Sequence, residues 1–88
     1  GRKDSNAGAI TVEFDNIPAA QALQYIASKA NASVTSITLK NITISEENLI
    51  KMIKRLQTSG GTLKVKSELL TTAVNAALSA KGWTGAAL

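Results

Sequence analysis

Residues 9–30 read AITVEFDNIPAAQALQYIASKA, and in this stretch a strand pattern passes directly into a helix pattern. Apolar residues occupy every second position of residues 10–14, which is typical of a strand with one buried face. Pro18 then suits the first turn of a helix, because its missing N–H would be unpaired there in any case. Apolar residues recur at steps of three and four over residues 19–30, which predicts an amphipathic helix.

The next segment, residues 33–44, is rich in Val, Ile and Thr, the residues that favour strands. Its apolar positions change parity between Leu39 and Ile42. The segment is therefore either two short strands or one strand that bends near Asn41.

A second helix is predicted over residues 46–58. Ser45 can cap its N-terminus, and the two glutamates that follow lie where the helix dipole favours negative charge. Glu47 and Lys51 stand four residues apart, in the order that favours an ion pair.

The last third of the chain repeats the strand and helix patterns. Residues 62–67 alternate as a strand, and residues 68–80 have the spacing of a helix that stops at Gly82. Residues 83–88 are either a short edge strand or a loose tail.

These segments predict one α+β domain over residues 9–88. We expect a small mixed sheet of about three to five short strands packed against two or three helices, in the order β-α-β(β)-α-β-α. Residues 68–88 either belong to this domain or form an added C-terminal helix and tail, and residues 1–8 are expected to be a flexible lead. We find no internal repeat or low-complexity linker that would divide the sequence.

Composition argues against the common kinds of enzyme. The 88 residues include no His and no Cys, which removes the usual general base near neutral pH, the commonest metal ligand and the thiolate nucleophile. The six carboxylates could act as a catalytic pair only in a deep cleft, which a domain of this size rarely encloses. We therefore expect a protein that is not an enzyme and has no cofactor and no metal site.

The charge balance favours acidic partners. Ten Lys and Arg against six Asp and Glu give a formal net charge of +4. No apolar stretch approaches the ~20 residues that cross a bilayer, so no membrane span is predicted.

The candidate partner-docking residues are five basic side chains and one tryptophan. The basic residues form either a docking patch for an acidic partner or a solvated face, and the tryptophan is either a lid on the core or an interface anchor. A free strand edge, at residues 10–14 or 62–65, would offer a further route to a partner by strand addition. The six candidates are Lys51, Lys54, Arg55, Lys64, Lys66 and Trp83.

Residues 12–27, VEFDNIPAAQALQYIA, resemble the short N-terminal domain shared by secretins and TonB-dependent transducers. In that family a strand that ends in a pattern like hxFDIP, where h is apolar, precedes a helix with spaced apolar residues. Residues 37–49, ITLKNITISEENL, look like the second unit of that domain, a strand and a helix opened by acids.

The resemblance implies a non-catalytic protein–protein interaction or assembly domain of a bacterial cell-envelope secretion, pilus, conjugation or TonB-type signalling machine. Its location would be periplasmic or outer-membrane-associated, and its partners would be other protein subunits of the assembly or further copies of the chain. The alternative is a small basic nucleic-acid-binding α+β domain. The basic helix and strand favour that alternative, and the absence of aromatic residues beside them for base stacking argues against it.

Overall fold

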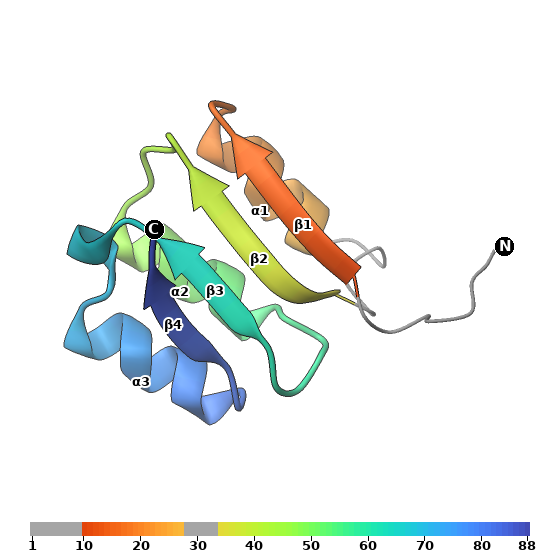
Figure 1. Cartoon of the computed structure of the whole chain (residues 1–88), viewed down its shortest axis with the longest axis vertical. Coiled ribbons are helices and arrows are strands. Elements are labelled where there is room, and N and C mark those ends of the chain that lie inside the picture. The colour runs from red at the N-terminus through yellow and green to blue at the C-terminus, as the bar shows by residue number, and fades with distance from the viewer. Residues whose placement is uncertain (1–9, 28–33) are drawn as a thin grey trace, which may run out of the picture.

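The computed structural model describes residues 10–27 and 34–88 (Figure 1). Within these ranges a four-stranded sheet in the order β1-β2-β3-β4 packs against three α-helices, and a single 3-10 turn, η2, precedes the third. The elements are β1 (Ile10–Asp15), α1 (Ala19–Ala27), β2 (Val34–Lys40), α2 (Glu46–Lys54), β3 (Thr62–Val65), η2 (Ser67–Leu69), α3 (Thr72–Ala80) and β4 (Thr84–Ala87).

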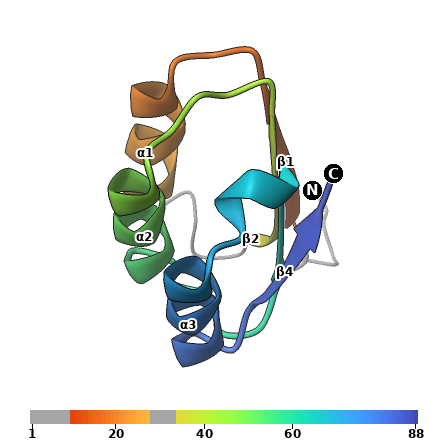
Figure 2. The same cartoon turned by 90° about the vertical axis from the view of Figure 1, so that its left-hand side faces the viewer.

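The predicted α+β class and element order are confirmed, and the fourth strand shows that residues 84–87 are a strand and not a loose tail. The sheet was expected to be mixed, but each strand pairs with the next in parallel. The reason is that a helix lies between every two successive strands. Each helix returns the chain to the end of the sheet where the previous strand began, so the next strand runs in the same direction. Right-handed crossovers in one constant direction also put every helix on one side. Figure 2 shows α1, α2 and α3 together on the same side of the sheet.

The ambiguous segment after α1 is one strand followed by a loop. β2 ends at Lys40, and Asn41 takes a left-handed backbone conformation with φ 54°. Ile42 and Ile44 belong to the loop that follows β2, and their side chains are buried. Because they are not part of the strand, they do not continue its alternation, which accounts for the change of parity. The parts of our predictions that fall on residues 1–9 and 28–33 lie outside the described residues.

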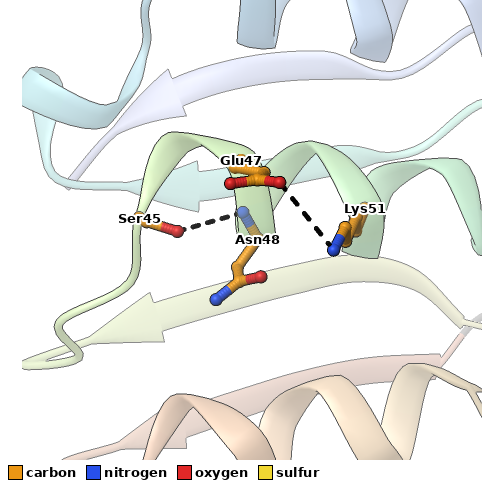
Figure 3. Close-up of polar contacts among 4 residues, drawn as sticks. All are labelled: Ser45, Glu47, Asn48 and Lys51. Carbon is orange, nitrogen blue, oxygen red and sulfur yellow. Dashed lines mark hydrogen bonds and ion pairs between the residues drawn. The ribbon is translucent and has the colours of Figure 1, made fainter.

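The two later helices are shorter than predicted. α2 ends at Lys54, with Arg55 as its C-cap, and Ser45 accepts a hydrogen bond from the backbone N–H of Asn48 at 3.1 Å as the predicted cap (Figure 3). The segment predicted as one helix from residue 68 divides into η2 and α3. The division occurs because Thr71 is the N-cap of α3, where its hydroxyl oxygen accepts a hydrogen bond from the backbone N–H of Val74 at 3.2 Å. α3 and β4 complete the same two layers as the earlier elements (Figure 1).

The structure contains a repeating strand–helix unit that we did not find in the sequence. Strand register aligns Val12 with Ile37, Ile37 with Leu63, and Leu63 with Gly85, so the offsets are 25, 26 and 22 residues. At the first offset the residues that follow the strand also repeat: Asn16-Ile17 and Asn41-Ile42, with both asparagines at positive φ. Units of this length, each one strand and one helix, are typical of solenoids in which every unit packs on its neighbours.

The core lies between the sheet and the three helices. Inward strand residues such as Ile37, Leu63 and Val65 are fully buried against the helices. The remaining core comes from the inner faces of the helices and from the loops, chiefly Ala22, Ile26, Ile42, Leu49, Met52, Ile53, Leu56, Val74, Leu78 and Trp83.

Candidate functional site

The side of the sheet that faces away from the helices is covered by no described element (Figure 2). Strand side chains alternate between the two faces of a sheet, so the residues that alternate with core positions in the regular part of each strand point to this side. We call it the open face. Its residues are Thr11, Glu13, Asp15, Ser36, Thr38, Lys40, Thr62, Lys64, Thr84 and Ala86.

Strand register arranges the open face in rows that cross all four strands. One row consists only of hydroxyl side chains, and the next runs from an acid through a threonine to a lysine and an alanine. Neighbouring positions in such a row are about 4.8 Å apart, the spacing of paired strands. The rows are Thr11, Ser36, Thr62, Thr84 and then Glu13, Thr38, Lys64, Ala86.

An open face of this kind is unusual for a parallel sheet. Parallel sheets are normally covered on both faces, and their strands then read as continuous apolar runs. Here β2 and β3 alternate buried apolar residues with more exposed polar ones, so one face is suited to water or to a ligand.

Charge on the open face is divided between the strands. The acids Glu13 and Asp15 lie on β1, and the bases Lys40 and Lys64 lie on β2 and β3. Asp15 also accepts a hydrogen bond from the side-chain amide of Asn41, at 2.9 Å between Nδ2 and Oδ1. The face therefore carries both signs of charge and is more basic toward β3.

The five basic candidates lie on different surfaces and so do not form one docking patch, which was the first of the two alternatives. Lys51, Lys54 and Arg55 are exposed on the helical layer, whereas Lys64 is on the open face, on the other side of the molecule. Lys66 is exposed just beyond the end of β3. The prediction of one surface came from the closeness of α2 and β3 in the sequence. The exposed side of the helical layer and the exposed side of the sheet, however, point in opposite directions.

Trp83 is a lid on the core and does not serve as an exposed anchor. Its side chain is 3% exposed, and its indole Nε1 donates a hydrogen bond to the carbonyl oxygen of Thr58 at 2.7 Å. A buried indole with its N–H satisfied is a structural residue. This observation removes Trp83 from the docking candidates.

Among the strands of the described residues, β1 and β4 are the two outermost ones. Of the two predicted edges, residues 10–14 lie on β1 and are at an edge. Residues 62–65 form β3, which is hydrogen-bonded on both sides, between β2 and β4. The second predicted edge is therefore wrong.

A shallow groove lies between α1 and α2 on the outer surface of the helical layer. Its volume is about 280 Å³, and its lining is Ala20, Leu23, Gln24 and Ala27 from α1 with Lys51 and Arg55 from α2. Sequence reasoning missed this groove because it counted Leu23 and Ala27 toward the buried face. The signal that could have found it is the spacing 20, 23, 24, 27, which places four uncharged residues on one side of a helix.

The ion pair predicted between Glu47 and Lys51 is present on α2, with Lys51 Nζ 3.9 Å from Glu47 Oε2 (Figure 3). Both side chains are largely exposed, at 82% and 61%. Such a pair contributes little to stability in water.

Two further observations describe the same ranges of the chain. Within residues 10–27 and 34–88, no three acidic side chains lie close enough together to hold a metal ion. None of the helices in the described part has the length and hydropathy needed to cross a membrane.

No family model, curated protein or solved structure matches the chain.

Proposed function

We propose that this chain is a non-catalytic protein-binding module and that the open face is its main binding surface. The observation that carries the proposal is the in-register array of polar side chains on an uncovered parallel sheet. Four strands hold these side chains at fixed spacing. The backbone of the two inner strands is hydrogen-bonded on both sides, so a partner would meet a preformed surface.

The repeating unit supports this proposal. In strand–helix solenoids the strands line one side and the helices the other, and the strand side is the usual extended binding surface. On the two inner strands the short side chains of Thr38 and Thr62 lie beside the longer, charged side chain of Lys64. A polypeptide lying across the strands could reach hydroxyl, acidic and basic groups in turn.

Nucleic acid is the rival partner, and the placement of the aromatic residues disfavours it. Single-stranded nucleic acid is usually held by exposed aromatic rings and a basic groove. The chain has one Phe, one Tyr and one Trp. Phe14 and Tyr25 pack edge to face with ring centroids 5.5 Å apart, and Trp83 is buried. The open face also carries Glu13 and Asp15, which would repel phosphates.

A narrower proposal places the module in the bacterial cell envelope, as a periplasmic or outer-membrane-associated subunit of a secretion, pilus, conjugation or TonB-type signalling machine. Its support is the resemblance of residues 12–27 to the secretin and transducer domain. Fractionation of cells that express the full-length gene product would test this location. Recovery in the cytosolic fraction alone would contradict the envelope proposal and leave the protein-binding proposal intact.

Site-specific photo-crosslinking tests the main proposal. A photoreactive residue at Thr38, in the middle of the open face, is expected to form a covalent product with a protein in cells of the source organism. The same residue at Ala76, exposed on α3, is the matched control and is expected to give no such product. Crosslinking from Ala76 with none from Thr38, or a product at Thr38 that nuclease removes, would contradict protein binding on the open face.

A further inference from the structure

The groove between α1 and α2 has an apolar side that faces solvent. Ala20 and Ala27 are exposed and Leu23 is half-buried, although all three follow the spacing that usually marks a buried stripe. A helix on the surface of a domain normally presents charged side chains there. α1, with the sequence AAQALQYIA, has no charged residue at all.

The other side of the groove is cationic. Lys51 and Arg55 stand four residues apart on α2 and so lie one above the other along the groove. Lys54 adds a third positive charge on the same helix. Lys51 Nζ lies 3.9 Å from Glu47 Oε2, and the side chains of this pair are largely exposed. The groove therefore combines an uncharged wall with a wall of positive charge.

We propose that this groove binds an amphipathic helix of a partner protein, one that has small or aliphatic residues on the side facing α1 and acidic residues on the side facing α2. Two neighbouring helices form a channel into which a third helix packs with its side chains between theirs. The stripe from residue 20 to residue 27 is about 10 Å long at 1.5 Å per residue, which matches two turns of a bound helix. Helix-in-groove recognition uses anchors with the same spacing on the bound helix.

Charge complementarity selects this occupant. A bound helix with Glu or Asp at i and i+4 would place its carboxylates along Lys51 and Arg55, and rim charges of this kind govern association rate and salt dependence. The site is on the helical layer and is separate from the open face (Figure 2). The proposal consequently stands or fails independently of the proposed function.

A labelled synthetic peptide provides the test. The probe is a capped peptide of about 14 residues, long enough to form some helix alone, with leucines at i, i+3, i+4 and i+7 and glutamates flanking that stripe on one side. We expect it to bind the wild-type chain, as measured by fluorescence anisotropy, with an affinity that falls as salt rises. Chemical-shift mapping is expected to place the peptide on α1 and α2. Shifts confined to the open face, or no binding, would overturn the proposal.

Paired variants separate the groove from net charge. Lys51→Glu with Arg55→Glu is expected to weaken binding about tenfold or more, because attraction becomes repulsion at the rim. Lys64→Glu with Lys66→Glu changes the net charge by the same amount on the sheet side and is expected to leave binding within about twofold, since exposed charges a Debye length or more away are largely screened. Equal loss in both double variants would overturn the assignment to the groove.

Two further controls address folding and occupancy. Ala20→Glu places an acid in the groove at the first turn of α1, where the helix dipole favours it, so the domain should stay folded while peptide binding is lost. A peptide with lysine in place of each glutamate should bind about tenfold more weakly than the acidic peptide. Equal binding of the two peptides would overturn the proposed role of charge in the groove.

Sedimentation of the wild-type chain tests whether a second copy of the chain occupies the groove instead. A dimer that the Lys51→Glu, Arg55→Glu variant dissociates would assign the groove to a second copy and overturn the proposal.

Discussion

Gly61 and Trp83 are packed so closely that no side chain fits between them. A Cβ added at Gly61 would lie 2.7 Å from Cζ2 of Trp83 and 2.6 Å from the carbonyl oxygen of Thr35. The indole thus lies over the start of β3, and its Nε1 is hydrogen-bonded to Thr58 in the loop before it. This contact joins the residue that precedes β4 to the connection between α2 and β3, two segments about a quarter of the chain apart in sequence.

Gly61→Ala is therefore expected to destabilise the fold. Both neighbours of the new methyl group are held in place, one as backbone and the other as a buried ring, so the clash must be relieved by moving the strand. The expected loss is about 1–3 kcal/mol in the free energy of unfolding, measured by urea denaturation followed by far-UV circular dichroism. Ser79→Ala, at an exposed position of α3, is the control and should change stability by less than about 0.5 kcal/mol. Wild-type stability in Gly61→Ala would show that the indole can move aside.

Thr71 joins two helices and is the subject of a second prediction. Its hydroxyl accepts from the backbone N–H of Val74 as the N-cap of α3 and donates to the Glu46 carboxylate at the start of α2. Thr71→Ala removes both hydrogen bonds and is expected to cost about 1–2 kcal/mol. Thr71→Ser keeps the hydroxyl and should retain most of the stability. Equal losses in the two variants would mean that the methyl group of Thr71, and not its hydroxyl, is what matters.

Local patterns in the sequence were sufficient to predict most of the elements. The alternation around Val12 and Phe14, the cap at Ser45 and the pair Glu47–Lys51 all depend on residues a few positions apart, and each is present in the structure. The division at Thr71 was missed because the apolar spacing continues across it, and only the hydroxyl as a cap distinguishes two segments from one.

What the sequence could not provide was the relation between elements. Parallel pairing follows from the path of each crossover between strands. The lysines on α2 and on β3 are close in the sequence, but α2 and β3 belong to different layers of the structure. The repeat escaped notice because its offsets differ and because only the first two units share the Asn-Ile pair. A search that aligned Asn16-Ile17 with Asn41-Ile42 would have found the 25-residue offset.

The left-handed turn after β2 leads to a third prediction. Asn41 has φ 54°, a conformation that asparagine tolerates and that β-branched residues resist. Asn41→Val is expected to lose about 1–2 kcal/mol, because a β-branched residue forced into this region costs about that much and asparagine adopts it more readily. Asn41→Gly relieves the backbone and gives up only the exposed hydrogen bond to Asp15, so it should stay within about 1 kcal/mol of wild type. Urea denaturation of both variants checks the order, and a valine variant as stable as the glycine variant would contradict the assigned backbone.

Adjacent residues on β2 should differ sharply in their effect on stability, because they belong to opposite faces of the sheet. Ile37 is fully buried against the helices, whereas Thr38 lies on the open face. Ile37→Ala is expected to cost about 2–5 kcal/mol, while Thr38→Ala should change the free energy of unfolding by less than about 0.5 kcal/mol. Thermal and urea denaturation of the two variants measure the difference. If Thr38→Ala were as costly as Ile37→Ala, then Thr38 would be packed against something in the folded chain, and the open face could not be the accessible surface that the proposed function requires.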